Sequence, residues 1–513
     1  MRATALSPLL PWLHIIALSL ATMAGAQEAR EGGPQLTTSP GATRPPDIGS
    51  RLELFVDDYL IDKMTGGAAL RLHHPTPREI VLVHDQPWEG TGSCFYDVFR
   101  DGDVFKLYYI GYQLTTEDGS ALTSHGIYAC YAESEDGIHW TKPDLGIVEY
   151  DGNTHNNIVW TRENADNFVV YKDANPDCRP GEEYKATASG PGGLWAYKSS
   201  DGLHWSPLKD GPIITKGAFD SQNLTFWDAE RGHYWAYFRD FHDGLRDIRV
   251  ATSEDYLTWS EPELLQYVDS PEEQLYTNQV MPYPRAPHIF IGFPTRYVER
   301  QWSPSFETLP DRAHRENRVK ISPRYGTAIT DGLFMTSRDG RLFNRWGEAF
   351  LRPGPERKDN WLYGDCYQGL GLIETQPEDP TAPPELSLYC PENTWKTNVR
   401  MRRYTMRIDG FVSISAPLKG GQMLTKPLLF SGNRLVLNFA TSAAGSVRVE
   451  LQDAAGKALE GFSLADCDEV FGDSLERTVT WQGKGDLSGL AGKPVRVRIA
   501  LSDADVYSLR FGQ

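Results

Sequence analysis

The 513-residue sequence lacks several patterns that mark common protein classes. It has no Cys-x-x-Cys and no His-Glu-x-x-His motif, which disfavours a structural zinc site or a zincin-type protease, and we expect no metal and no cofactor. It also has no basic stripe with interleaved aromatic residues, and its formal net charge of −18 repels polyphosphate. We therefore expect no nucleic-acid partner.

Cysteine is scarce, and the spacing of the six residues matches no known disulfide framework. An even number of cysteines in an oxidising compartment can nevertheless pair. They are Cys94, Cys130, Cys178, Cys366, Cys390 and Cys467.

Long hydrophobic runs are missing beyond the N-terminus. The run at 9–21 contains Pro11 and His14 and is shorter than the roughly 20 uninterrupted apolar residues that a membrane span requires. It follows Met1-Arg2 and leads to the small residues at 24–26, so we predict a signal peptide over 1–26, cleaved before Gln27. The mature chain is then expected to be soluble, without an integral membrane segment, and secreted or periplasmic.

Residues 27–50 are rich in Gly, Pro, Ser and Thr and poor in apolar side chains. Such a segment buries too little surface to offset the entropy lost on ordering, and we predict a flexible linker there. The remaining length of about 460 residues exceeds a usual single core, but repeated sheets that pack only on their neighbours escape this limit.

Long helical periodicity is absent, and a turn motif recurs instead. The pattern Ser-x-Asp-Gly-x-x-Trp, with variations, places aspartates between two short apolar strands, as in a hairpin closed by a tight turn. We expect each carboxylate to accept hydrogen bonds from the turn's own amides and to be structural. The motif aspartates are Asp136, Asp201, Asp255, Asp339 and, in a degenerate copy, Asp409.

Five copies, spaced roughly 50 to 80 residues apart, predict an all-β fold: a five-bladed β-propeller with a C-terminal β-sandwich domain. We predict the propeller over 51–416 and the sandwich over 417–513, where alternating strands follow Gly-rich turns. The strand at 52–62 is expected either to close the ring beside the last blade or to be a plain edge strand. The predicted blades are 90–150, 160–215, 219–270, 275–355 and 361–416.

Aromatic residues are numerous, with 14 Trp and 24 Tyr. Their flat apolar faces and polar edges suit the C–H faces and hydroxyls of sugars, although most are expected to fill the propeller core. The predicted partner is therefore a carbohydrate.

The first strands of propeller blades converge on one axial pocket, where hydrolysis of a glycosidic bond needs two carboxyl groups. Asp97 stands in an otherwise apolar strand, where an unpaired charge is costly, so it needs a polar partner or a pocket. Asp173 suits either an ordinary Asx turn or a site residue. Asp220 has neutral hydrogen-bonding neighbours of the kind that polyol recognition uses. These three are the predicted catalytic residues.

Other polar residues of the first and second strands are predicted to bind substrate, the alternative for the charged ones being ordinary salt bridges. They are Gln222, Asn223, Arg239, Asn278, Arg296, Asp365, Glu392 and Trp395.

On the segment from Phe95 to Tyr109, the recurring turns and the appended sandwich, residues 51–513 resemble the five-bladed propeller glycosidases of glycoside hydrolase families 32, 43, 62, 68 and 117, especially exported family-32-like proteins. The resemblance implies a nucleophile or base at Asp97, a residue that stabilises the transition state or tunes the acid at Asp173, and the general acid at Asp220. The chain has Asp220 where that family has Glu, and no intact W-M-N-D-P motif.

We therefore expect an exported glycoside hydrolase acting on an oligo- or polysaccharide. Two alternatives are a non-catalytic glycan-binding propeller, and a phosphorylase or transglycosidase on the same fold. The sugar, its linkage, the stereochemical outcome and the oligomeric state stay open.

Overall fold

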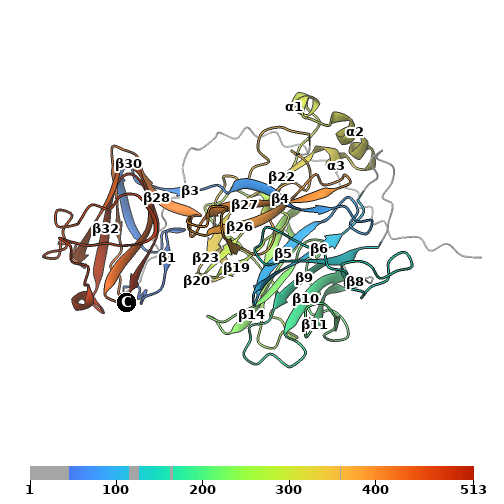
Figure 1. Cartoon of the computed structure of the whole chain (residues 1–513), viewed down its shortest axis with the longest axis horizontal. Coiled ribbons are helices and arrows are strands. Elements are labelled where there is room, and N and C mark those ends of the chain that lie inside the picture. The colour runs from blue at the N-terminus through green and yellow to red at the C-terminus, as the bar shows by residue number, and fades with distance from the viewer. Residues whose placement is uncertain (1–44, 115–125, 162–165, 359) are drawn as a thin grey trace, which may run out of the picture. The chain divides into compact units, whose positions relative to one another are not determined.

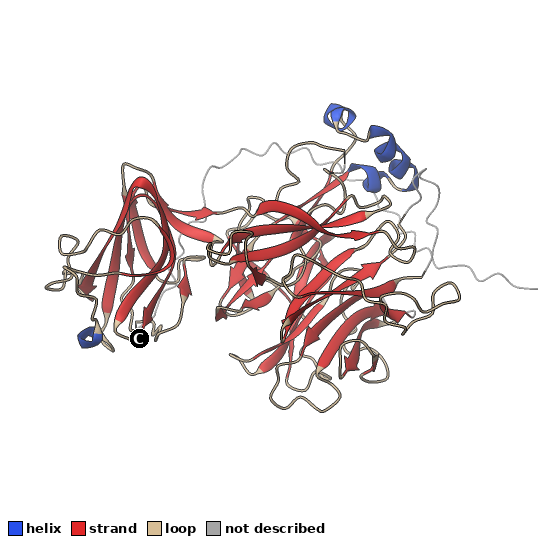
Figure 2. Cartoon of the chain, viewed as in Figure 1, coloured by secondary structure: helices blue, strands red, loops and turns tan. Residues whose placement is uncertain are grey.

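A computed structural model describes residues 45–114, 126–161, 166–358 and 360–513 (Figure 1). These residues form an all-β protein with seven sheets, and helices are few (Figure 2). Within the described ranges, no helix has the length and apolar character needed to cross a membrane. The helices are α1 (Pro304–Thr308), α2 (Arg312–Ile321), α3 (Pro323–Thr327) and the 3-10 turn η1 (Ser488–Leu490).

Five sheets follow one another along the chain, and each is built mainly from consecutive antiparallel strands. The first contains β5 (Cys94–Asp101), β6 (Val104–Gly111), β7 (Tyr128–Ser134) and β8 (Ile158–Thr161). The second contains β9 (Asp166–Lys172), β10 (Tyr184–Gly190), β11 (Gly193–Ser199) and β12 (Ser206–Pro207). The third contains β13 (Leu224–Asp228), β14 (His233–His242), β15 (Leu245–Ser253) and β16 (Glu263–Leu264).

The fourth and fifth sheets complete this series. The fourth contains β17 (Gln266–Val268), β19 (Met281–Tyr283), β20 (Ala286–Gly292), β23 (Met335–Ser337) and β24 (Leu342–Arg345), with β17 parallel to β24. A separate small sheet holds β18 (Gln274–Leu275), β21 (Thr295–Glu299) and β22 (Ala328–Gly332). The fifth contains β25 (Ile373–Thr375), β26 (Glu385–Glu392), β27 (Val399–Arg407) and, from far upstream, β4 (Thr76–His84).

The strand that joins the fifth sheet differs from the one expected. The segment 52–62 was expected to close the ring or to form a plain edge, but β1 (Glu53–Leu54) pairs with β32 (Val495–Gly512) and β2 (Ile61–Gly66) pairs with β29 (Gly421–Thr425). The core of the C-terminal sheet buries three apolar side chains of this segment, those of Phe55, Leu60 and Ile61. This burial explains why the segment pairs with the C-terminal sheet instead of the fifth sheet. The fifth sheet takes β4 instead, which pairs antiparallel with β27.

Apolar clusters connect the five sheets in a cycle. Each cluster draws buried side chains from two successive sheets, and one cluster joins the fifth sheet to the first. Representative pairs, from the first sheet onward, are Tyr108 with Val170, Ala196 with Ala236, Tyr237 with Phe290, Phe334 with Leu388, and Tyr389 with Val98. The sheets are therefore stabilised by burial between neighbours.

The recurring aspartates have the predicted structural role. Asp136 Oδ1 accepts hydrogen bonds from the backbone N–H groups of Ile138 and His139, both at 2.8 Å. The same two bonds recur at Asp201, Asp255 and Asp339. Asp409, in the degenerate copy, instead accepts from the Tyr283 hydroxyl at 2.6 Å. The prediction is confirmed for the four well-formed turns.

Three of these turns are also held by a tyrosine from the neighbouring sheet. The Tyr389 hydroxyl donates to the Gly137 carbonyl, Tyr108 to that of Gly202 and Tyr237 to that of Gly340. In the remaining turn Tyr256 replaces the glycine, and the neighbouring sheet has the smaller Thr187 in the register position of Tyr108 and Tyr237.

The last sheet has eight antiparallel strands around its own apolar core. Strands from both sides of the predicted domain boundary at 416 share this sheet, so its pairing extends beyond 417–513. Besides β1, β2, β29 and β32, the sheet contains β3 (Ala69–Leu72), β28 (Val412–Ala416), β30 (Arg434–Asp453) and β31 (Asp473–Thr478).

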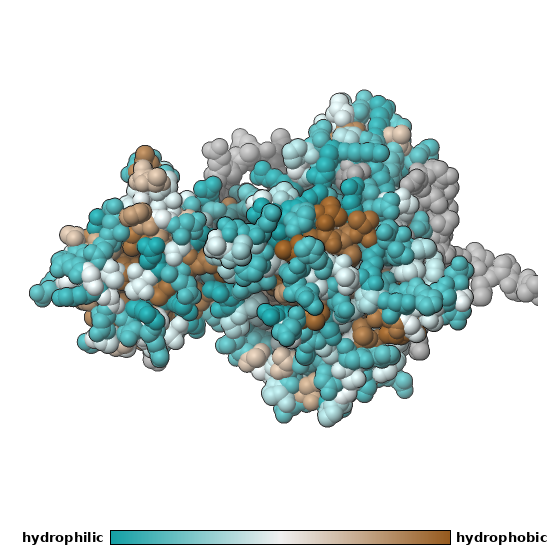
Figure 3. Space-filling model, in the orientation of Figure 1, coloured by the Kyte–Doolittle hydropathy of each residue, from teal (hydrophilic) through white to brown (hydrophobic). Residues whose placement is uncertain are grey.

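The thiols and the surface add two constraints. All six cysteines lie in described segments and none of them forms a disulfide, so the possible pairings are not made. The face in Figure 3 is mainly hydrophilic with separate apolar areas, which agrees with a charged fraction of 23%.

Candidate functional site

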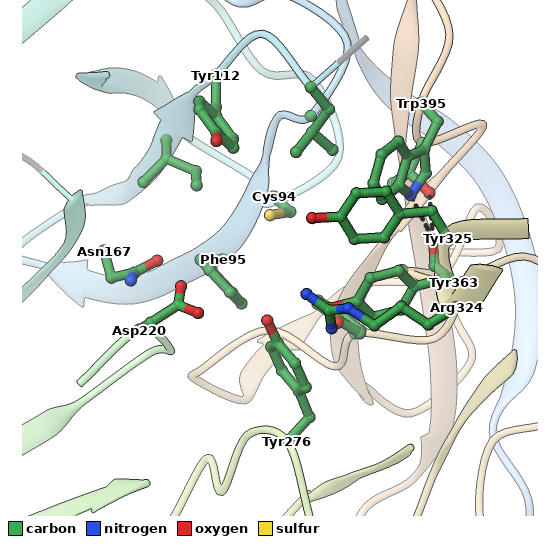
Figure 4. A pocket seen from close by; sticks show the side chains of 16 residues that line it. Cys94, Phe95, Tyr112, Asn167, Asp220, Tyr276, Arg324, Tyr325, Tyr363 and Trp395 are labelled. Carbon is green, nitrogen blue, oxygen red and sulfur yellow. Dashed lines mark hydrogen bonds between the residues drawn. The ribbon is translucent and has the colours of Figure 1, made fainter. Parts of the chain in front are cut away.

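A pocket of about 200 Å³ lies where the chain enters the first strands of the five sheets (Figure 4). Its walls combine aromatic rings with a few polar side chains. The described lining residues are Gly92, Cys94, Phe95, Ile110, Tyr112, Leu114, Asn167, Asp220, Tyr276, Arg324, Tyr325, Tyr363, Gly364, Tyr367, Thr394 and Trp395.

Each of the five successive segments contributes to this pocket near the start of its first strand. Phe95 belongs to β5 of the first sheet and Asn167 to β9 of the second, whereas Asp220 precedes β13 of the third, Tyr276 precedes β19 of the fourth and Tyr367 precedes β25 of the fifth. Phe95 and Asn167 have left-handed backbone conformations, with φ of 55° and 57°. This convergence of strand starts around one pocket is the relation that the repeat predicts.

Asp220 is the single carboxylate among the described lining residues. Its side chain is 81% exposed, and its Oδ2 lies 3.4 Å from Nη2 of the buried Arg239. In Figure 4 the Asp220 carboxylate lies beside Asn167, and the Arg324 guanidinium and the Tyr276 hydroxyl face it across the open space. The pocket thus places an accessible carboxylate opposite a cation and a phenol.

The aromatic wall is rigid. Trp395 donates from Nε1 to the Tyr363 carbonyl at 2.7 Å, and its ring centroid is 4.8 Å from that of Tyr325. The rings of Tyr276 and Tyr367 are stacked with centroids 5.3 Å apart. Flat faces fixed in this way present apolar surface with hydroxyl edges, which is what a sugar ring contacts.

Asp97, predicted as nucleophile or base, does not line the pocket. Its side chain is buried, and Oδ2 accepts a hydrogen bond from the backbone N–H of Val170 in the second sheet, at 2.6 Å. Burial raises the pKa of Asp97 well above its usual range. The β5–β6 pairing shifts register between Cys94 and Asp97, so side-chain alternation counted from the sequence does not apply here.

Asp173 also lies outside the pocket. It follows the end of β9 opposite to Asn167, about 20 Å away along an extended strand. Its carboxylate pairs with Lys185, and it accepts from the Tyr234 hydroxyl at 2.9 Å and from the Asn175 N–H at 3.0 Å. The last bond is the Asx turn that was the alternative reading. Asp97, Asp173 and Asp220 are therefore not brought together.

The predicted amide residues form a buried hydrogen-bond network. Gln222 accepts at Oε1 from Gln279 Nε2, which also donates to the Gln368 carbonyl at 2.7 Å. Asn278 donates to the Gln222 carbonyl at 3.4 Å, and Asn223 donates to neighbouring carbonyls at 2.8 Å. These side chains join segments of different sheets and do not line the pocket.

Two predicted binding residues are occupied by ion pairs. Arg296 contacts Asp331 and Glu273, at 2.6 and 2.7 Å. Glu392 contacts Arg357 and Arg402, each at 2.6 Å. For both residues, the alternative of an ordinary salt bridge accounts for the charged side chain.

Asp365 is buried beside the pocket wall without lining the pocket itself. Its Oδ2 accepts from the Leu362 N–H at 2.9 Å. Burial, with a smaller contribution from the negative charge of Glu392, raises the pKa of Asp365 to about 7.

Of the predicted residues, Asp220 and Trp395 line the pocket and Arg239 contacts Asp220. Sequence reasoning missed Arg324 and Tyr325, which come from the helical insertion at 304–327. This insertion lies outside the repeated hairpins, so the repeat carried no signal for it. No group of three or more His, Cys, Asp or Glu side chains in the described segments could hold a metal ion.

Comparison with known proteins gave structural similarity only. No family profile matches the sequence, and no curated protein matches it. One similar solved structure is a glycoside hydrolase with 12% identity and a TM-score of 0.41, over 66% of this chain and 93% of the other. Another is a glycoside hydrolase family 43 arabinoxylan arabinofuranohydrolase from Bacillus subtilis, with 11% identity and a TM-score of 0.38, over 83% and 96%.

A third similar structure belongs to the GH130 family of mannoside phosphorylases, which contains glycoside hydrolases that target β-1,2 mannosidic linkages in Candida mannan. It shares 13% identity with a TM-score of 0.40, over 65% of this chain and 94% of the other. At TM-scores below 0.5, the function has to be argued from the site.

Proposed function

We propose that this protein is an exported carbohydrate-active enzyme on a five-bladed propeller, acting on a glycosidic bond with Asp220 as general acid or base. One observation carries the proposal. An accessible carboxylate faces a cation and a wall of fixed aromatic rings across a pocket to which five successive segments contribute. The cyclic series of apolar clusters supports the propeller, and the N-terminal pattern at 1–26 supports export.

Asp220 is suited to proton transfer because solvent and substrate reach its carboxylate directly. Arg239, whose Nη2 lies 3.4 Å from Oδ2 of Asp220, holds the carboxylate in this position. Asn167, beside it in Figure 4, offers an amide donor and acceptor to sugar hydroxyls. Hydrolysis requires a second carboxyl group or an equivalent nucleophile at the same site.

A second candidate reaction is phosphorolysis, which is favoured by the single described carboxylate and by Arg324 opposite it. Inorganic phosphate would then supply the nucleophile. A phosphate oxygen attacks the anomeric carbon, the glycosidic C–O bond breaks, and the Asp220 carboxyl group gives its proton to the leaving oxygen. No second protein carboxylate is needed in this reaction.

The test is a broad oligosaccharide panel assayed with and without phosphate, on wild type, Asp220→Asn and the exposed control Asp210→Asn. Loss of a general acid or base lowers kcat by about 10² to 10⁴-fold, so Asp220→Asn should lose at least 100-fold while Asp210→Asn stays within twofold. Asp97→Asn distinguishes the two assignments. A folded, fully active Asp220→Asn protein, or an enzyme inactivated only by Asp97→Asn, would overturn the role of Asp220.

A wild-type protein that binds saccharides but cleaves none, with or without phosphate, would indicate glycan binding alone. Phosphate-dependent turnover would select phosphorolysis, and phosphate-independent turnover would select hydrolysis.

A further inference from the structure

Arg324 is a pocket cation without an acidic partner. It is half-buried, and its neighbours are aromatic: Nη1 lies 3.5 Å from the Tyr363 hydroxyl, and the guanidinium is 4.9 Å from the centroid of the Tyr325 ring. No carboxylate of the described chain lies within 4.0 Å of the Arg324 guanidinium, whose electrostatic partners are tyrosines. The hydroxyl of one of them, Tyr297, donates a hydrogen bond to Glu299 at 3.5 Å. A guanidinium stays ionised at all ordinary pH values, so this charge is permanent.

Two further arginines lie against the rings of the same pocket. Arg239 is 5.0 Å and Arg246 5.7 Å from the centroid of Tyr276. Arg239 faces Asp220, whereas Arg246 donates to the neutral Gln274 at 2.6 Å, and its Nε is buried without a hydrogen-bond partner in the described ranges. Three arginines thus lie in or against the walls of this pocket, whereas the described lining residues include one carboxylate, that of Asp220.

Arg318 strengthens the positive character of the same wall. Its guanidinium is 5.6 Å from the centroid of Trp395, and the side chain is buried, with none of its three nitrogens hydrogen-bonded to any described residue. Burial, followed by repulsion from Arg315, lowers the pKa of Arg318 to about 9. An anion held nearby would stabilise this uncompensated cation.

This local excess of positive charge stands against a chain whose formal net charge is −18. Surface charge of that sign repels anions, so a cationic pocket is needed if the ligand itself is acidic. A planar guanidinium among aromatic side chains binds a carboxylate, sulfate or phosphate through paired, charge-assisted hydrogen bonds.

We propose that Arg324, with the hydroxyls of Tyr276 and Tyr325, forms a subsite for an oxyanion of the substrate. The anion is either an acidic substituent of the saccharide, such as a uronate carboxylate or a sulfate ester, or free phosphate acting as co-substrate. This inference rests on the proposed function, because it assigns the ligand class of the same pocket.

The experiment uses the full mature chain and a glycan array of matched neutral, uronate-containing and sulfated oligosaccharides. The best anionic ligand, its neutral counterpart and inorganic phosphate are then titrated by calorimetry against three proteins: wild type, Arg324→Gln and the control Arg300→Gln, which removes an exposed arginine. Arg324→Lys keeps the positive charge but lacks the paired N–H donors of the planar guanidinium. The melting temperature of each variant verifies that it is folded.

We expect wild type to bind at least one anionic ligand tenfold or more tightly than its neutral counterpart. Arg324→Gln should lose at least tenfold of that affinity, Arg324→Lys should lose less, and Arg300→Gln should bind like wild type. Binding of phosphate alone identifies the free co-substrate, and binding of the acidic oligosaccharide identifies the substituent.

Equal affinity for charged and neutral ligands would overturn the oxyanion subsite while leaving the proposed function intact, as would unchanged anion binding by a folded Arg324→Gln protein. Failure of the protein to bind any saccharide would instead overturn the proposed function.

Discussion

Asp365→Asn should make the protein more stable above neutral pH. Burial raises the pKa of Asp365 from 3.8 to about 7. Because a difference of one in pKa corresponds to 1.36 kcal/mol, ionising the Asp365 carboxyl group costs about 4 kcal/mol more in the folded protein than in the unfolded chain. Asparagine resembles the neutral acid in shape, keeps an oxygen to accept from the Leu362 N–H, and has no proton to lose.

The sign follows from proton linkage. A carboxyl group with a raised folded-state pKa holds its proton more tightly when folded, so its contribution is complete below pH 3.8 and is lost as the pH rises to about 7. Between these values the wild type should lose about 1.4 kcal/mol per pH unit relative to the variant. The two proteins should be similar near pH 4, and the variant should be about 4 kcal/mol more stable at pH 8.

The measurement is urea unfolding followed by tryptophan fluorescence, at pH 4, 5, 6, 7 and 8. Asp210→Asn serves as the control, because that carboxylate is exposed and its removal should leave the pH dependence unchanged. Parallel stability curves for wild type and Asp365→Asn across this range would refute the reasoning, and a variant that is less stable at pH 8 would show that the ionised group is satisfied in the folded state.

Two other predictions concern the links between sheets. Lys142→Met removes the cation 2.8 Å from the buried Glu89, which also contacts His84, and should lower the free energy of unfolding in urea by about 3 kcal/mol at pH 7. Burial opposes a low pKa for Glu89, but His84 and Lys142 lower it to about 2. The cost of the substitution should therefore shrink as the pH falls from about 4.5 towards 2, and a constant cost would contradict an electrostatic origin. Gly202→Ala adds a Cβ 2.6 Å from the Tyr108 hydroxyl at a φ of +81° and should lower the free energy of unfolding by about 2 kcal/mol. The control Gly211→Ala has a similar φ of +86°, but its added Cβ meets no described atom within 4 Å beyond its chain neighbours, so it should cost about 1 kcal/mol. Equal costs would show that the Tyr108 contact contributes nothing.

Local hydrogen bonds explain why the turns could be predicted from sequence. The carboxylate of Asp136 accepts from amides two and three residues away, so the motif itself contains the acceptor and both donors of these two bonds. The choice of β4 rather than 52–62 beside β27 was not predictable in this way. Both segments read as strands, and only the long-range burial of Phe55 and Leu60 in the C-terminal sheet decides between them.

The site was predictable in position but not in composition. Strand starts do meet at one pocket, yet the charge in an otherwise apolar strand selected Asp97, while the pocket receives Cys94 and Phe95. The left-handed conformation of Phe95 and the register shift beside it turn the following side chains, and neither is visible in an apolar strand sequence. Asp220 was selected for its neutral hydrogen-bonding neighbours, and it precedes its strand, where no such shift intervenes.

The same reasoning explains why Arg324 was not predicted. The positions that a five-fold repeat can predict are those that every sheet shares, and at these starts the chain has Phe95, Asn167, Asp220, Tyr276 and Tyr367, with a single charge among them. Arg324 enters from the insertion between β21 and β22, an element without a counterpart in the described parts of the other four sheets. Ligand specificity in this pocket is therefore expected to follow the insertion more than the repeat. Exchanging α1 to α3 for a short turn should remove anion discrimination while leaving the five sheets paired.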